Sequence, residues 1–535
     1  MKKYIADIRI AAIVLAASAA AFAACTSEEY IVEEQPAEPQ RYTLTVAASK
    51  GEDAATRALS LDDKTLNAAW ATSEHVYVQK GGTWASGSLQ PQAGGATATL
   101  SGTLSDIEIN ADDNLTLQFP KSGEVSYDGQ SGTLADIAAN FDYATATVEV
   151  ESVSASGSIN PKAATTTFAN QQAIIKFTLK KSDGSPLPGN PTAFTVSDGT
   201  STVSLTDIPA ATYTTNGDGV LFVAFPATGS AATITLTATV GSATYTYEKS
   251  GVTFTNGTYR TITVKMALPT DGDGYYLLGS VQDWKDFAEI VNSGTNASAN
   301  ARMTADIDLG DDQTHIGTIG DSSVGRVCYS GIFDGQGHTL TVAYVGTTNY
   351  SAPFTQTKNA TIKNIHVTGT IQSAYGQANG ILSVARGDDY ISNAWVSVNI
   401  TSTGSGWQEC ASICGVTDYV AHVYITDCLF TGEINFNGSY NGCFLGYNSG
   451  SATITNCLST GTFKNGSSND FRGTHTNCYV KQFPSTIPTA MQLTDEQLTD
   501  GTITANLNNG RTGADAPWVQ DAGADEPRLA LFVNP

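Results

Sequence analysis

A short unit recurs four times in this sequence: Ile362-Lys363-Asn364, Ile391-Ser392-Asn393, Ile425-Thr426-Asp427 and Ile454-Thr455-Asn456. The Asn or Asp residues that end the copies follow one another at intervals of 29, 34 and 29 residues, and Asn477 ends a degenerate fifth copy. A period near 30 residues with one polar turn residue per repeat is typical of solenoids, in which each repeat forms one coil. The repeats therefore predict a parallel β-helix in the C-terminal part of the chain.

The residues after each Asn or Asp alternate in character. Those at odd positions are small or apolar in every copy, so we expect them to point into the coil, because successive side chains of a strand face opposite sides. The Asn or Asp itself is expected to form a bend, since these residues tolerate left-handed backbone angles. The expected interior residues are Ile365, Val367, Gly369 and Ile371; Ala394, Val396, Val398 and Ile400; Cys428, Phe430, Gly432 and Ile434; and Cys457, Ser459, Gly461 and Phe463.

Three cysteines, Cys428, Cys457 and Cys478, fall in one interior column of this register. With coils about 4.8 Å apart, they fit as small buried hydrophobic residues, and a disulfide between neighbours is also sterically allowed. Cys410 and Cys414 have no further Cys or His pair at the spacing of a zinc site. We expect no metal and no cofactor here.

A second column, two positions after each Asn or Asp, should face outward and is largely apolar. Two interpretations of this column are open. Either the apolar tail at 481–535 packs over it, or it forms an exposed face that binds a glycan or a protein, with Trp395 at its centre. Its members are His366, Trp395, Leu429, Leu458 and Tyr479.

The region from Tyr42 to Lys265 contains short runs in which apolar and polar residues alternate, bounded by Gly, Asn, Asp or Ser. This pattern predicts an all-β fold with two sandwiches. After a linker, apolar residues recur at helical spacing and predict a short helix over 281–292. The expected units are a first sandwich at 41–155, a second at 163–266, a linker at 267–274, the β-helix at 275–480 and a capping tail at 481–535.

Several motifs in the sandwich region occur in a fixed order: Arg57-Ala58, Leu117-Gln118-Phe119-Pro120, Gly132-Thr133-Leu134-Ala135-Asp136 and Gly219-Val220-Leu221-Phe222-Val223-Ala224-Phe225-Pro226. Over about 225 residues this order resembles the fimbrillin family. The resemblance implies two transthyretin-like sandwiches and a role as a type V pilus subunit or a related surface protein.

The fimbrillin resemblance also gives Arg57 a candidate role. In polymerising members a protease cuts after an Arg near the first strand. The cut removes that strand and opens a groove, which a strand of a neighbouring subunit then fills by β-augmentation. Arg57 matches that Arg; the other interpretation is an ordinary solvated side chain.

The start of the repeat region carries a second resemblance. Ala305-Asp306-Ile307-Asp308-Leu309 and Gly331-Ile332-Phe333-Asp334-Gly335-Gln336-Gly337-His338, together with the helix and the repeats, resemble the right-handed parallel β-helix of GLUG-type surface proteins. Asp306, Asp308, Asp311 and Asp312 are weak candidates for calcium ligands. The alternative is that they form the turn into the first coil.

The first 24 residues have the pattern of a secretory signal, with Lys2, Lys3 and Arg9 before an apolar run. Phe22-Ala23-Ala24-Cys25 resembles a bacterial lipobox, although Leu is usual where Phe22 stands, and the resemblance implies a lipid on Cys25. The acidic tether at 25–40 is similar to export signals of surface lipoproteins. We expect an outer-membrane protein, anchored by lipid and facing the exterior; an ordinary signal peptide is the alternative.

Charge and motifs limit the function classes. The chain has 27 Lys and Arg against 51 Asp and Glu, a net charge of −24, which argues against nucleic acid as a partner. No nucleophile, zinc-protease or phosphate-loop motif is present in the sequence. We therefore interpret the chain as a surface adhesin or accessory fimbrial subunit that binds an extended glycan or a host or community protein. The alternative is a surface-anchored polysaccharide lyase or glycosidase with a β-helix fold.

Overall fold

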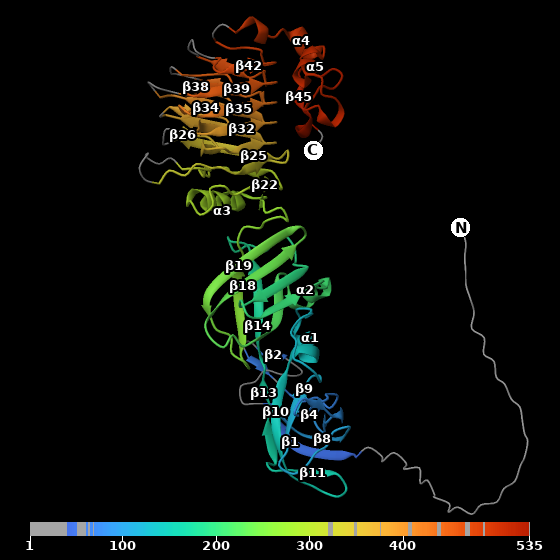
Figure 1. The fold of residues 1–535 in the computed structure, drawn as a ribbon. Coiled ribbons are helices and arrows are strands. Elements are labelled where there is room, and N and C mark those ends of the chain that lie inside the picture. Colours follow the sequence, from blue (N-terminus) through green and yellow to red (C-terminus); the bar gives the residue numbers. More distant parts are fainter. Residues whose placement is uncertain are drawn as a thin grey trace, which may run out of the picture.

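The computed structural model describes residues 40–50, 60–62, 65–67, 69–318, 325–346, 350–374, 376–404, 409–435, 440–465, 471–484 and 487–533. The prediction of an all-β chain is confirmed, since strands dominate and the helices are few and short. Three units, two sandwiches and a β-helix, follow one another along the chain (Figure 1).

The first sandwich is built from one continuous sheet of eleven strands. Its β10 pairs with β9 through its first half and with β11 through its second half, with a bulge between Val150 and Ser152. A strand that bends at a bulge passes from one layer to the other, so a single sheet encloses the core. The strands are β1 (Tyr42–Ser49), β4 (Tyr77–Lys80), β5 (Thr83–Trp84), β6 (Ser86–Gly87), β7 (Gln90–Pro91), β8 (Thr97–Ser105), β9 (Asn114–Phe119), β10 (Ala144–Val153), β11 (Ser158–Pro161), β12 (Thr165–Thr167) and β13 (Ala169–Asn170). A separate hairpin is formed by β2 (Ser60–Asp62) and β3 (Thr65–Asn67).

The second sandwich packs a three-stranded sheet against a four-stranded one. The sheets are β17 (Val220–Pro226), β14 (Gln172–Lys180) and β20 (Tyr259–Lys265), and β16 (Thr202–Leu205), β15 (Ala193–Ser197), β18 (Ala232–Val240) and β19 (Ala243–Val252), with helix α2 (Ala210–Asn216) at one edge.

The chain crosses between the sandwiches in ways that differ from the expected boundaries. β12 and β13 lie after residue 163 but pair with β1 and β10 of the first sheet, and Phe168 is buried in the first core. Conversely, a segment between β9 and β10 containing α1 (Leu134–Asp136) and a π-helical turn (Ile137–Phe141) contributes Tyr127, Ile137 and Tyr143 to the second core. Alternation within a strand does not specify which neighbouring core it joins, so the sequence pattern could not place these segments.

The β-helix consists of parallel strands throughout, and its helix α3 (Val281–Asn292) has the predicted bounds. The first sheet comprises β21 (Tyr276–Leu278), β22 (Ala301–Met303), β24 (Ile332–Asp334), β28 (Thr361–Lys363), β32 (Asp388–Ser392), β35 (His422–Thr426), β39 (Ser451–Thr455) and β42 (Thr474–Thr476). The second comprises β23 (Ile307–Asp308), β25 (Thr339–Gly346), β29 (His366–Ser373), β33 (Trp395–Ser402), β36 (Leu429–Phe430), β37 (Glu433–Asn435), β40 (Leu458–Ser459), β41 (Thr462–Lys464) and β43 (Tyr479–Val480). The third comprises β27 (Phe354–Thr357), β31 (Leu382–Ala385), β34 (Cys414–Thr417) and β38 (Leu445–Asn448), and β26 (Tyr350–Ser351) pairs β30 (Gln377–Ala378).

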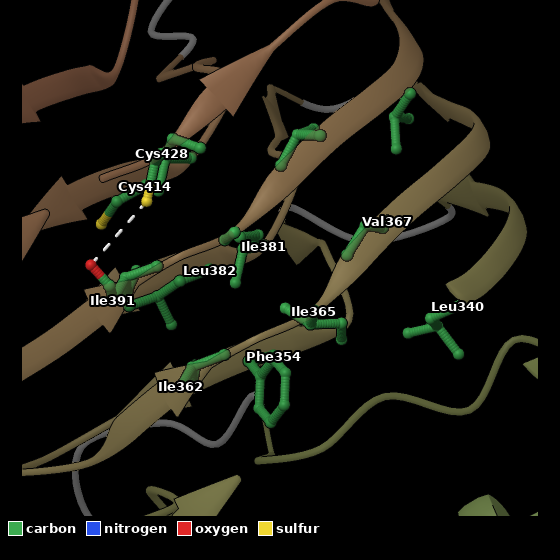
Figure 2. Packing of buried hydrophobic residues seen from close by; sticks show 14 of the residues in the cluster. Leu340, Phe354, Ile362, Ile365, Val367, Ile381, Leu382, Ile391, Cys414 and Cys428 are labelled. Atoms are coloured by element: carbon green, nitrogen blue, oxygen red, sulfur yellow. Dashed lines mark hydrogen bonds between the residues drawn. The ribbon is translucent and has the colours of Figure 1, made fainter. Parts of the chain in front are cut away.

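The interior of the β-helix follows the predicted register. Figure 2 shows Ile362, Ile365 and Val367 from one coil and Ile391 from the next among the buried apolar residues of one core. Of the predicted interior residues only Gly369 is half-exposed; the others are buried. The predicted bends are confirmed, because the five residues that end the repeats have positive φ: Asn364 57°, Asn393 51°, Asp427 52°, Asn456 53° and Asn477 50°.

The tail follows the last coil and lies beside the β-helix in Figure 1. It contains short elements: 3₁₀ turns at Thr489–Met491, Gly513–Asp515 and Ala530–Phe532, helices α4 (Asp495–Thr499) and α5 (Thr502–Asn508), and the hairpin of β44 (Trp518–Val519) and β45 (Arg528–Leu529). Among the described residues, no helix has the length and apolar character needed to span a membrane.

Candidate ligand-binding surface

The outward column predicted from the repeats is a real column of the second sheet. His366 pairs in register with Trp395, Trp395 with Leu429, Leu429 with Leu458, and Leu458 with Tyr479. One residue from each coil therefore lies on one line along the β-helix.

The tail covers the second half of this column. Leu429 and Leu458 are 1% and 0% exposed, and they form a separate hydrophobic cluster with the tail. An exposed face made of all five residues is therefore wrong: of the two interpretations, packing of the tail is the one found for Leu429 and Leu458. The tail residues in this cluster are Leu493, Leu498, Ile503, Leu507, Trp518 and Leu529.

Asp427 fixes the position of the tail on the β-helix. Arg511 donates from Nη1 and Nη2 to the two carboxylate oxygens of Asp427 at 2.7 and 2.6 Å, and Trp518 Nε1 donates to Oδ1 at 3.2 Å. All three hydrogen bonds are charge-assisted, because the acceptor is the Asp427 carboxylate, and they are therefore strong. The one Asp among the turn residues of the repeats is the residue on which the tail docks.

The first half of the column remains partly open. The rings of His366 and Trp395 stack in parallel with centroids 3.9 Å apart, and Phe532 of the tail contacts both edge-on at 6.1 Å. Trp395 Nε1 donates to Thr431 Oγ1 at 2.8 Å. Burial lowers the pKa of His366 to about 4, so the ring is neutral at physiological pH.

A depression of about 470 Å³ opens beside this aromatic cluster. Aromatic side chains line it together with polar ones, among them His338, whose Nδ1 lies 3.4 Å from Asp306 Oδ1. An apolar wall with a few oriented polar groups is the usual composition of a ligand site. The lining includes Asp306, His338, Thr339, His366, Trp395 and Phe532. We call this site the aromatic depression.

Backbone N–H groups engage three of the four aspartates considered for calcium, and two of these hydrogen bonds lie in local turns. Asp306 Oδ1 accepts from Thr339 N at 2.8 Å, Asp308 Oδ1 from Gly310 N at 3.0 Å, and Asp312 Oδ1 from Thr314 N at 2.8 Å. Asp312 is also ion-paired with Lys285 at 3.0 Å. Asp311 lies in the same turn, and within the described ranges no group of three acidic, His or Cys side chains is placed to hold a metal ion.

The cysteine column is present and its thiols are free. Cys428, Cys457 and Cys478 are all buried, as are Cys410, Cys414 and Cys443, and no disulfide joins the described cysteines. Burial raises the pKa of the Cys457 thiol. All three cysteines of the column pack in the apolar core of the β-helix. Cys25 and Arg57, the expected lipidation and processing residues, lie outside the described residues.

Two aromatic features were not predicted from the sequence. Phe532 covers Trp395, but nothing in the tail sequence marks it for that contact. Tyr390 and Tyr424, on adjacent strands of the first sheet, stack with centroids 4.7 Å apart and 5° between ring planes. The sequence does contain the pattern that predicts this stack, because both tyrosines stand three residues before the Asn or Asp of their repeat.

No protein-family model and no curated protein matches the chain. Among solved structures, a fimbrial protein of Bacteroides ovatus is 9% identical with a TM-score of 0.23, covering 42% of this chain and 49% of its own, so this chain spans about half of that protein's length. A candidate cell adhesion protein of Bacteroides uniformis is 14% identical with a TM-score of 0.24, and the match covers 42% of this chain and 93% of that protein. A candidate cell adhesion protein of Bacteroides ovatus is 13% identical with a TM-score of 0.26, and the match covers 44% of this chain and 96% of that protein.

Proposed function

We propose that the protein is a cell-surface adhesin or accessory fimbrial subunit, held by lipid on Cys25, with its β-helix binding an extended ligand. The sandwiches serve as a stalk, and the ligand binds in the aromatic depression. The observation that carries the proposal is that the tail buries Leu429 and Leu458 but leaves a depression walled by His366, Trp395 and Phe532.

Binding is tested with the mature protein on arrays of glycans and of surface proteins. Trp395→Ala should weaken binding about tenfold, because it removes an aromatic wall worth roughly 1–2 kcal/mol. Trp84→Ala in the first sandwich is the matched control and should bind as the parent does. Phe532→Ala gives a second route if Trp395→Ala perturbs folding; unchanged affinity in both variants refutes the depression as the binding site.

Assembly through Arg57 is a finer part of the proposal. Processing would remove residues up to Arg57 from the surface form and free the edge that β1 now occupies between β8, β11 and β12. Mass spectrometry of the surface-released protein tests it, and retention of residues 25–57 argues against polymerisation by strand exchange. Radiolabelled lipid that persists on a Cys25→Ala variant argues against the anchor.

A further inference from the structure

One turn of the β-helix is longer than its neighbours and projects apolar side chains. Between the third and first sheets, the coils before and after use two-residue turns, at 386–387 and 449–450, whereas the intervening coil uses four, Asp418–Ala421. The extra length carries Tyr419 and Val420, which are 81% and 91% exposed. Insertions in single repeats often mark the binding side of a solenoid.

The protruding turn leads directly into the stacked tyrosines. His422 begins β35, and its ring contacts Tyr424 with centroids 4.2 Å apart. His422 is held by hydroxyls, with Nε2 2.9 Å from Thr453 Oγ1 and Nδ1 2.5 Å from Ser451 Oγ. Tyr419, Val420 and Tyr390 are three of the five large hydrophobic residues exposed among the described residues, so exposed apolar surface is concentrated at this corner.

The tyrosine stack leaves one ring face uncovered. The stacked rings lie one coil apart, so their planes face along the β-helix axis. On its other side Tyr390 is in register with Thr361, whose short side chain cannot cover a phenol ring. Tyr390 is accordingly 46% exposed, and its free face forms a shelf above Thr361. We call this site, together with Tyr419 on the turn that leads into β35, the tyrosine shelf.

The charges around the tyrosine shelf balance. Lys363 is ion-paired with Asp334 at 3.2 Å and Arg386 with Asp418 at 2.5 Å, and Asp389 is buried. With the chain at −24 overall, this surface does not attract a polyanion. Uncharged hydroxyl-bearing ligands match it: the C–H face of a sugar ring packs on the negative face of an aromatic ring, and the hydroxyls of Thr361, Tyr390 and Tyr424 offer hydrogen bonds.

We propose that the tyrosine shelf is a binding site for a neutral glycan, with one sugar ring on the free face of Tyr390 and the next against Tyr419. It lies on the first sheet, apart from the aromatic depression on the second. The inference rests on the proposed binding function for its context and adds a ligand class and a second surface.

The test is an array of neutral oligosaccharides of glucose, xylose, mannose and N-acetylglucosamine beside sulfated and uronic-acid oligosaccharides, followed by calorimetry on the best neutral probe. Tyr390→Ala should lower affinity about tenfold and Tyr419→Ser several-fold. Thr361→Tyr should abolish binding with the fold intact, because a third stacked ring would occupy the shelf. Val345→Ser, which removes an exposed valine from β25 on another sheet, is the matched control and should have no effect.

The outcomes separate this inference from the proposed function. Loss in Tyr390→Ala and Thr361→Tyr with retention in Trp395→Ala supports the shelf even if the depression fails. Unchanged affinity in both shelf variants, binding of acidic glycans only, or capture of a protein and no neutral glycan through Tyr419 overturns it.

Discussion

His366 is a polar ring in an otherwise apolar column, and its environment accepts only one charge state. One ring face is stacked on Trp395, and the ring nitrogens lie 2.8 Å from Ser397 Oγ and 3.2 Å from Thr339 Oγ1. A neutral imidazole satisfies both hydroxyls. A protonated ring would place a positive charge in a largely buried site, where only Asp306 acts in its favour.

This environment predicts a loss of stability in mild acid. The pKa of His366 is about 4 in the folded protein and about 6.5 when unfolded. The unfolded chain therefore binds the extra proton first, and stability falls as pH drops from about 6.5 to 4. The contribution lost between pH 7 and pH 5 is about 2 kcal/mol. Chemical unfolding at both pH values, followed through the fluorescence of Trp395 and the other tryptophans, gives the free energy of unfolding. Its loss between pH 7 and pH 5 should be smaller in His366→Gln than in the parent. An equal loss in parent and variant would contradict the assignment of the effect to His366.

At the level of elements, the repeats predict the β-helix interior well because each Asn or Asp fixes the register of its own coil. Side-chain hydrogen bonds join turn residues of neighbouring coils into a ladder. Asn393 Nδ2 donates to Asn364 Oδ1 at 2.8 Å, and Asn477 Nδ2 donates to Asn456 Oδ1 at 3.3 Å. Asp427 interrupts it, since a carboxylate has no donor for Asn393 Oδ1, which is buried without a partner. The docking of Arg511 was not predictable from the sequence, because it joins positions 84 residues apart with no shared period.

The interrupted ladder predicts the behaviour of an Asp427→Asn variant. The new amide would complete the ladder to Asn393, but the ion pair with Arg511 would be lost. A charge-assisted pair contributes about 1.5–3 kcal/mol against about 1 kcal/mol for the neutral bond gained. Hydrogen exchange of the tail over 487–533 should therefore accelerate roughly three- to thirtyfold while the coils remain protected. Asp388→Asn, an exposed Asp on β32, is the control, and equal exchange in the two variants would mean that Asp427 does not hold the tail.

At the scale of the whole molecule, the second sandwich and the β-helix are joined by backbone pairing as well as by the linker. Thr244 of β19 exchanges hydrogen bonds with Thr270 at 2.8 and 3.0 Å, Thr270 forms a bridge with Tyr276, and Tyr276 begins β21 of the first β-helix sheet. The residues expected to be a free linker thus extend one sheet into the next. A joint of this kind couples the orientation of the second sandwich to that of the β-helix.

The side chains at this joint give the last prediction. Lys181 Nζ of β14's C-terminal loop lies 2.9 Å from Asp283 Oδ1 in α3, with the two side chains 17% and 8% exposed, and Ser182 donates to Asp286. Lys181→Met leaves Asp283 buried without its cation, at a cost of about 1–3 kcal/mol. We expect a larger radius of gyration in small-angle X-ray scattering and faster hydrogen exchange over 267–279. Lys464→Met breaks an ion pair with Glu433 that is 53% and 43% exposed and should change neither measurement. A Lys181→Met protein that scatters and exchanges as the parent does would show that this ion pair is not needed to hold the two units together.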